Sequence, residues 1–185
     1  MLEAPVYRNY INGEFMAEPT STLDVFNPAN GELLSRVPNG SADEVDLAVN
    51  AAKAAQKEWA AKPANERAGY LRVIANKIRE NADRLATIIT QEQGKVPSLA
   101  RVEVDFTADY MDYMAEWARR IEGEVITSDR PGENILLFRK PVGVVAGILP
   151  WNFPFFLIAR KMAPALVTGN TIVIKPSEET PNNCF

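Results

Sequence analysis

A rigidly held amide side chain is the first group in this sequence that could do chemistry. Asn152 lies between Pro150 and Pro154 in the segment Pro-Trp-Asn-Phe-Pro, and proline fixes its own φ and restricts the residue before it. An amide N–H in a fixed direction suits an oxyanion hole, because a donor already aimed at developing negative charge needs no reorganisation during reaction. The alternative is that Asn152 caps the helix that follows, and local chemistry by itself favours the cap.

A lysine and a carboxylate form a second candidate site. Lys175 and Glu178 belong to the segment Ile-Lys-Pro-Ser-Glu, directly after an apolar stretch. A carboxylate in this place can accept hydrogen bonds from both hydroxyls of an adenosine ribose, and the ammonium can donate to the same hydroxyls. Glu178 would also repel a 2′-phosphate, which favours NAD over NADP. The alternative is a surface ion pair, the commoner state of a nearby Lys and Glu.

Both segments follow predicted strands. The run from Val142 to Leu149 is apolar with small residues, which is typical of a strand buried on both faces of a parallel sheet, and residues 171–174 repeat the pattern. Residues 155–168 are predicted to form a helix that Gly169 ends. Strand, helix and strand form a right-handed crossover unit, in which ligands bind beyond the carboxyl ends of the strands. The predicted fold class is α/β, with both candidate segments at one sheet edge.

Hairpins and packing helices are expected before this unit. Asn12-Gly13 predicts a tight hairpin turn, and Ser41 with Glu44 forms a capping box for a helix that runs to about Lys62. A helical stretch broken near Asn81 and capped by Gly94 follows, and then a helix over residues 98–121. Residues 122–140, two short extended pieces around a turn-rich Asp129–Gly132, predict a protruding hairpin.

Two apolar stripes on these helices are expected to be buried. Packing in the core is favoured over the wall of a ligand tunnel for the aromatic stripe of the last helix, because spaced aromatic residues on a helix are usually core. That stripe consists of Phe106, Tyr110, Tyr113, Met114 and Trp117. The stripe of the first helix consists of Val45, Ala48, Val49, Ala52, Ala55 and Trp59.

Composition excludes several classes of function. The chain has 185 residues, 46% hydrophobic and 24% charged, as in ordinary globular domains. Its net charge of -4 and the lack of a basic face argue against nucleic-acid binding. Residues 1–5 lack the pattern of a targeting signal and no apolar run is long enough for a membrane span, so a cytoplasmic location without membrane contact is expected.

The counts of histidine and cysteine restrict the chemistry further. With no histidine, Ser-His-Asp and Cys-His catalysis within these residues is excluded, and so is the commonest transition-metal ligand, so no metal site is expected. The single cysteine, Cys184, cannot form an internal disulfide. Because no cationic neighbour is identifiable in sequence to lower its pKa, Cys184 is expected to be an ordinary thiol.

Taken together, the two candidate segments form a family pattern. The run from Pro141 to Glu178 closely resembles the aldehyde dehydrogenase superfamily, and the resemblance extends over nearly the whole chain, including residues 10–15 and 26–29. Within the superfamily the sequence is most similar to the lactaldehyde and glycolaldehyde dehydrogenases. In these enzymes a cysteine thiolate attacks the aldehyde, hydride passes to NAD, and water releases the acid.

The resemblance assigns roles to particular residues. It implies that Asn152 is an oxyanion-hole amide, and it implies NAD contacts from two sets of residues: Ile148, Leu149, Pro150 and Trp151 by backbone and packing, and Lys175, Pro176, Ser177 and Glu178 at the adenosine ribose. Arg160 corresponds to an arginine in members that accept acidic or hydroxylated aldehydes, and its donors could bind such a substrate. A structural arginine on an exposed face is an equal alternative. Phe153 and Phe156 are candidate apolar walls.

The resemblance also implies what lies outside this sequence. Members of the superfamily are more than twice as long, and their catalytic cysteine, general-base glutamate and last oligomer strand correspond to positions beyond residue 185. The expected organisation is therefore residues 1–121 as N-terminal strands and helices of an NAD-binding domain, 122–140 as an oligomerisation hairpin, and 141–185 as the start of the parallel sheet, an incomplete fold. The full-length protein is expected to be a homo-oligomer that oxidises a small aldehyde. The alternative is a non-catalytic nucleotide-binding or subunit-assembly module.

Overall fold

A computed structural model describes residues 4–185; residues 1–3, the start of the predicted N-terminal segment, lie outside the described residues. Five α-helices and four two-stranded sheets make up this part of the chain, with two short 3₁₀ helices at Glu116–Arg119 and Asn182–Cys184. The helices are α1 (Ala42–Ala61), α2 (Ala64–Glu80), α3 (Ala82–Gln93), α4 (Pro97–Ala115) and α5 (Phe156–Val167). The strands are β1 (Tyr10–Ile11), β2 (Glu14–Phe15), β3 (Thr22–Phe26), β4 (Leu33–Pro38), β5 (Glu124–Thr127), β6 (Asn134–Leu137), β7 (Val144–Ile148) and β8 (Thr171–Lys175).

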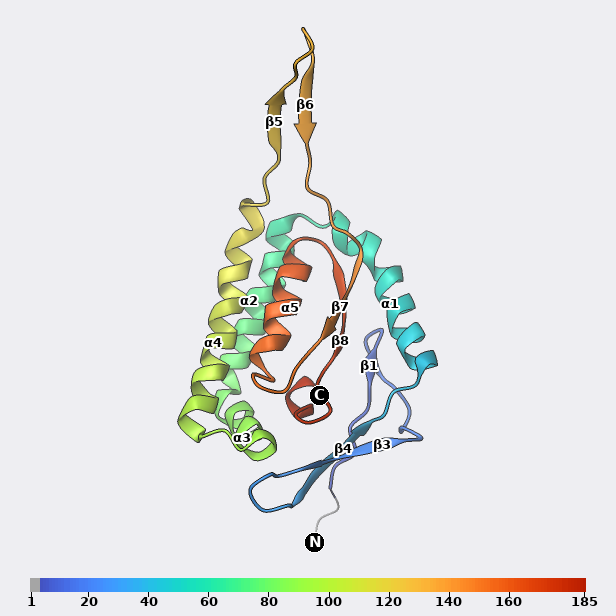
Figure 1. Ribbon diagram of the computed structural model, residues 1–185, viewed down its shortest axis with the longest axis vertical. Coiled ribbons are helices and arrows are strands. Elements are labelled where there is room, and N and C mark those ends of the chain that lie inside the picture. Colours follow the sequence, from blue (N-terminus) through green and yellow to red (C-terminus); the bar gives the residue numbers. More distant parts are fainter. Residues whose placement is uncertain (1–3) are drawn as a thin grey trace.

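The parallel pair β7–β8 lies between helices. Figure 1 shows α5, α2 and α4 on one side of the pair and α1 on the other. Helix α5 connects the two strands, so strand, helix and strand occur in the predicted order, and the strands pair in parallel. The expected burial on both faces is wrong for this chain: most residues of β7 and β8 are partly exposed, because the sheet has only two strands among residues 4–185.

Several local predictions are confirmed. Asn12 and Gly13 have positive φ angles of 55° and 82° in the β1–β2 hairpin, as a tight two-residue turn requires. The capping box of Ser41 and Glu44 is formed at the start of α1. Gly94 ends α3 in the left-handed region, with φ of 73°.

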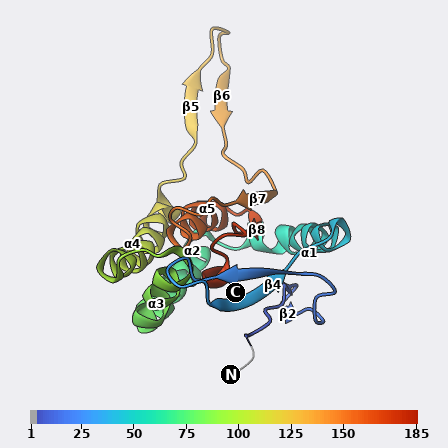
Figure 2. The same ribbon diagram turned by 60° about the horizontal axis from the view of Figure 1, so that its bottom comes forward.

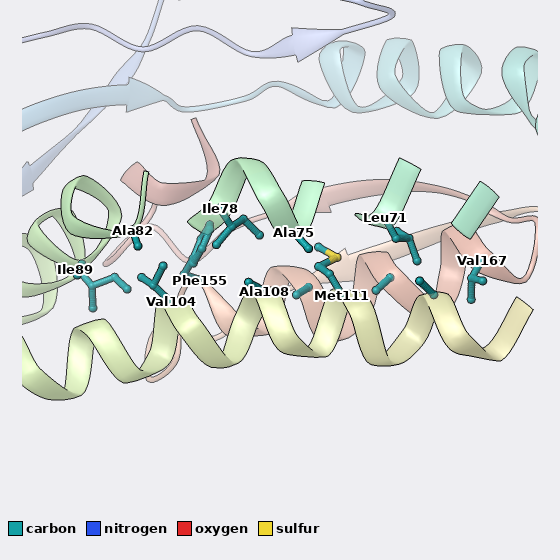
Figure 3. Packing of buried hydrophobic residues seen from close by; sticks show 14 of the residues in the cluster. Leu71, Ala75, Ile78, Ala82, Ile89, Val104, Ala108, Met111, Phe155 and Val167 are labelled. Atoms are coloured by element: carbon teal, nitrogen blue, oxygen red, sulfur yellow. The ribbon is translucent and has the colours of Figure 1, made fainter. Parts of the chain in front are cut away.

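The hydrophobic core joins α2, α3, α4 and α5. More than half of its residues are alanines, whose small side chains let the helix backbones approach closely. Figure 3 shows Met111 of α4 beside Ala75 in the space between α2 and α4, and Ile89 and Val104 at one end of the same cluster. This core fixes α5, and therefore the turn that leads into it.

The two predicted apolar stripes are buried only in part. Helix α1 has no fully buried residue and Val45 is 55% exposed, although Ala48, Ala52 and Trp59 are partly buried. On α4 the fully buried residues are mostly small or aliphatic; Tyr110 and Met114 of the stripe lie partly buried against this core, whereas Phe106 is 53% and Tyr113 50% exposed. The aromatic face of α4 is therefore a surface feature.

An extended hairpin projects from the body. Strands β5 and β6 pair antiparallel within residues 122–140, and every residue of both strands is exposed. Figures 1 and 2 show that the hairpin stands away from the helices in both views. Apolar residues face solvent here, among them Val125 at 77% exposure and Leu136 at 58%. A surface of this kind is typical of an interaction site.

Candidate functional site

The two candidate segments meet at the carboxyl ends of β7 and β8. Ile148 lies opposite Lys175 in the parallel register, and the Leu149 N–H donates to the Lys175 carbonyl at 3.1 Å. Further along, the Thr180 hydroxyl donates to the Trp151 carbonyl at 3.3 Å. Residues that are separated in sequence thus form one edge of the molecule, where open parallel sheets bind ligands.

Asn152 does not cap α5, so the alternative from local chemistry is wrong. The residue at the cap position is Phe155, and no side chain of that residue makes a capping bond. Asn152 itself is exposed, and its side-chain amide makes no hydrogen bond within residues 4–185. An exposed amide with unused N–H groups is available to donate to a ligand.

The turn before α5 is held by three side chains that sequence analysis missed. The Glu103 carboxylate accepts from the Phe155 and Phe156 N–H groups at 3.0 and 3.1 Å, and so takes over the capping of α5. Gln93 and Lys95 donate to the Asn152 carbonyl at 2.8 and 3.2 Å. One feature of the sequence could have indicated this role: Glu103 is a carboxylate on the same helical face as the small residues around it, where it must find a partner when buried.

Lys175 and Glu178 form an ion pair of 2.7 Å, with side chains 61% and 59% exposed. The hydrogen bond from Lys175 lowers the pKa of Glu178, with a smaller contribution from the electrostatic attraction between them. Exposed pairs of this kind contribute little to stability. The structure therefore contains the surface ion pair that was the alternative to a ribose site. Both side chains are also exposed enough to exchange water for the hydroxyls of a ligand.

The other predicted cofactor residues differ in accessibility. Ile148 is 71% and Trp151 58% exposed, so both offer apolar surface beside Lys175. Leu149 is 5% exposed and its N–H is bonded to the Lys175 carbonyl, which leaves only its own carbonyl for a ligand contact. The hydroxyl of the buried Ser177 accepts a hydrogen bond from the Glu179 N–H at 3.2 Å and shapes the turn.

The predicted substrate residues lie around α5. Phe156 packs against Phe106 and Tyr110, with ring centroids 4.6 and 5.5 Å away, and so forms part of the aromatic face of α4. Burial raises the pKa of the Tyr110 hydroxyl, and the positive charge of Arg160 opposes that rise. Arg160 is exposed. Phe153 differs from Phe156, because its ring lies 4.2 Å from the Lys95 ammonium in a cation–π contact.

Cys184 has the properties of an unreactive thiol. Burial, followed by the nearby charge of Glu92, raises its pKa to about 11, so the nucleophilic thiolate is scarce near neutral pH. Within residues 4–185, no group of three or more Cys, Asp or Glu side chains could hold a metal ion. None of the helices there is long and apolar enough to cross a membrane.

Comparison with known proteins places these features in a family. The family model described as "Aldehyde dehydrogenase family" matches residues 15–185. Lactaldehyde dehydrogenase of Escherichia coli (strain K12) is 62% identical over 177 residues, which cover 95% of this chain and 37% of that protein. The chain thus spans little more than a third of the length of this curated relative.

Solved structures agree with the sequence comparison. A crystal structure of lactaldehyde dehydrogenase from Escherichia coli superposes with a TM-score of 0.96 at 60% identity, covering 98% of this chain and 38% of that one. A structure of PnpE in complex with nicotinamide adenine dinucleotide has a TM-score of 0.91 at 42% identity, covering 96% of this chain and 37% of that one. The match extends over both segments at the carboxyl ends of β7 and β8, and the chain belongs to the aldehyde dehydrogenase family.

Proposed function

We propose that the protein containing this chain oxidises a small hydroxylated or acidic aldehyde, of the lactaldehyde and glycolaldehyde class, to its carboxylic acid with NAD. The exposed, unpartnered amide of Asn152 beside the sheet edge carries this proposal. The 62% identity to a lactaldehyde dehydrogenase supports the substrate class. Arg160, exposed near the aromatic face of α4, is proposed to bind the substrate hydroxyl or carboxylate, with Phe153 and Phe156 as apolar walls.

The residues of this chain have two tasks in that reaction. The Asn152 amide donates to the substrate oxygen as negative charge develops on it, which lowers the energy of the transition state more than that of the bound aldehyde. Lys175 and Glu178 hold the adenosine ribose, and Ile148, Pro150, Trp151 and Pro176 border it. NAD bound beside these residues would supply the acceptor for the hydride that leaves the aldehyde carbon.

A chimera tests the proposed reaction. This protein, the chimera, consists of residues 1–185 of this chain followed by the remaining sequence of Escherichia coli lactaldehyde dehydrogenase. We expect lactaldehyde-dependent NADH formation from the chimera and none from the purified 185-residue chain, whose single cysteine has a raised pKa. Cysteine-dependent NADH formation by the 185-residue chain would contradict the second expectation. A folded but inactive chimera would count against the first.

Replacing Glu178 by glutamine is expected to weaken NAD binding by about tenfold or more, because a charged acceptor is lost from the ribose hydroxyls. Isothermal titration calorimetry of NAD with the chimera measures the change. The neighbouring Glu179 is also exposed, so Glu179→Gln provides a matched control with the same loss of charge. Equal weakening in both variants would indicate a general electrostatic effect rather than a ribose contact.

The exposed hairpin supports a homo-oligomer, and it also favours subunit assembly as a second, non-catalytic role. Val125, Ile135 and Leu136 expose apolar surface on strands whose outer edges are unpaired within residues 4–185. We expect light scattering to show a dimer or larger assembly, and Leu136→Lys to shift it toward the monomer. A monomeric unsubstituted protein would contradict this expectation.

A further inference from the structure

The turn that carries Asn152 is fastened to the corner between α3 and α4. Gln93 donates to the Trp151 carbonyl at 3.0 Å and to the Asn152 carbonyl at 2.8 Å. Lys95 donates to the Asn152 carbonyl at 3.2 Å and to Glu103 at 2.5 Å. The same carboxylate accepts from the N–H groups at the start of α5.

The two charged side chains of this arrangement are buried. The Glu103 side chain is 1% and the Lys95 side chain 13% exposed. A buried carboxylate is stable only when its charge is paired and its oxygens accept hydrogen bonds, and here one oxygen faces the helix start and the other faces Lys95. The Lys95 ammonium is in turn placed between Glu103, the Asn152 carbonyl and the Phe153 ring.

We propose that Gln93 and Lys95, with Glu103 behind them, are positioning residues for the Asn152 amide. The inference rests on the proposed function for the role of Asn152. The backbone carbonyl of Asn152 has two donors on one side, whereas its side chain has no partner within residues 4–185. Holding the carbonyl restricts the backbone at Asn152, and with it the position of Cβ, so fewer side-chain positions are open to the amide before substrate arrives.

The expected size of the effect follows from geometry. A donor in an oxyanion hole acts only when it lies within hydrogen-bond distance of the developing charge, and a displacement of about 1 Å can cost about 100-fold in rate. Loss of Gln93 removes one of the two donors to the Asn152 carbonyl, so we expect a fall in kcat of about tenfold for Gln93→Ala. The KM for the aldehyde should change little, because the interaction lost develops in the transition state.

Hydrogen exchange on the 185-residue chain tests the positioning without any reaction. Gln93→Ala is expected to speed exchange of the Phe155 and Phe156 amides, which follow the loosened turn, and to leave the β3–β4 hairpin unchanged. Gln91 is exposed on the same helix, so Gln91→Ala is the matched control. Unchanged exchange at the turn in Gln93→Ala would overturn the inference, and so would equal acceleration in all segments.

A double-substitution cycle in the chimera tests the link to Asn152. If Gln93 acts through the amide, Gln93→Ala should lower kcat in the parent chimera and have no further effect once Asn152 is alanine. Lys95→Arg keeps a charged donor and should restore most of the activity that Lys95→Met loses. Additive losses from Gln93→Ala and Asn152→Ala would overturn the inference.

The two proposals fail in different ways. If Asn152→Ala leaves kcat unchanged, the oxyanion role is wrong, whatever the exchange data show. If Asn152→Ala lowers kcat but Gln93→Ala and Lys95→Met do not, the oxyanion role stands and the positioning role is overturned. Lys95→Met leaves Glu103 buried without its partner, so thermal unfolding of that variant is measured alongside kcat, and Gln93→Ala decides the question if Lys95→Met does not fold.

Discussion

Replacing Asn152 by alanine is expected to lower kcat of the chimera by about 100- to 1,000-fold, the loss measured when one oxyanion-hole donor is removed. The physical reason is the state of the amide: it is exposed, unpartnered within residues 4–185, and held on a turn that other side chains fix. Asn152→Asp provides a variant of equal size that lacks the donor, and it should lose at least as much activity.

Steady-state kinetics with lactaldehyde separates the possible outcomes. We expect kcat and kcat/KM to fall together, because an interaction made only in the transition state is lost. A rise in KM at constant kcat would mean that Asn152 contributes uniform binding only, and the proposed role would be wrong. Asn50 is an exposed asparagine on α1, so Asn50→Ala should leave both constants unchanged.

The stability of the 185-residue chain is expected to fall as pH rises from about 5 to 8, by about 3 kcal/mol. Burial raises the pKa of the Glu92 carboxyl to about 7, against the effect of hydrogen bonds from the Asn182 and Asn183 N–H groups, which lower it. A carboxyl with a raised pKa in the folded state binds its proton more tightly there than in the unfolded chain. The contribution of Glu92 to the free energy of unfolding is therefore complete below the pKa of the unfolded chain, and it is lost as pH rises through about 7.

Urea unfolding at several pH values measures this loss. The sequence contains no histidine, so no imidazole titrates in the same interval. Glu92→Gln cannot ionise and should flatten the profile between pH 5 and pH 8, whereas Glu116→Gln, on an exposed position, should keep it. A profile that is already flat for the unsubstituted chain, or the same in Glu92→Gln, would contradict the assignment.

The same contacts explain why the C-terminal segment is tied to the rest of the chain. Glu92 accepts from the Asn182 N–H at 2.8 Å, and the Asn182 side chain accepts from the Ser35 hydroxyl of β4 at 2.6 Å. The Tyr7 and Phe185 rings stack 5.5 Å apart. Figure 2 shows the C-terminus beside β4. Deprotonation of Glu92 therefore places a charge where α3, β4 and the C-terminal segment meet, and is expected to destabilise the contacts among them.

Features that depend on a few neighbouring residues could be predicted from the sequence. The turn at Asn12-Gly13, the capping box at Ser41 and the cap at Gly94 all rely on backbone angles and hydrogen bonds within one turn of chain. The strand, helix and strand order around Asn152 and Lys175 was predictable for the same reason. The periodicity of the apolar residues defines each element, and the ends of two parallel strands must be adjacent.

Burial and side-chain partners were decided by tertiary structure. Helix α4 has two apolar faces, and periodicity could not tell that the small residues, rather than Phe106 and Tyr113, enter the core; close packing against α2 and α5 selects the small ones. Likewise, Glu103 caps a helix that begins more than fifty residues later, and Gln93 reaches Asn152 across a similar separation. The sequence determined that a rigid amide follows a strand. The packing of α3 and α4 against α5 decided which side chains hold the backbone of the turn that carries this amide, while the amide itself has no partner within residues 4–185.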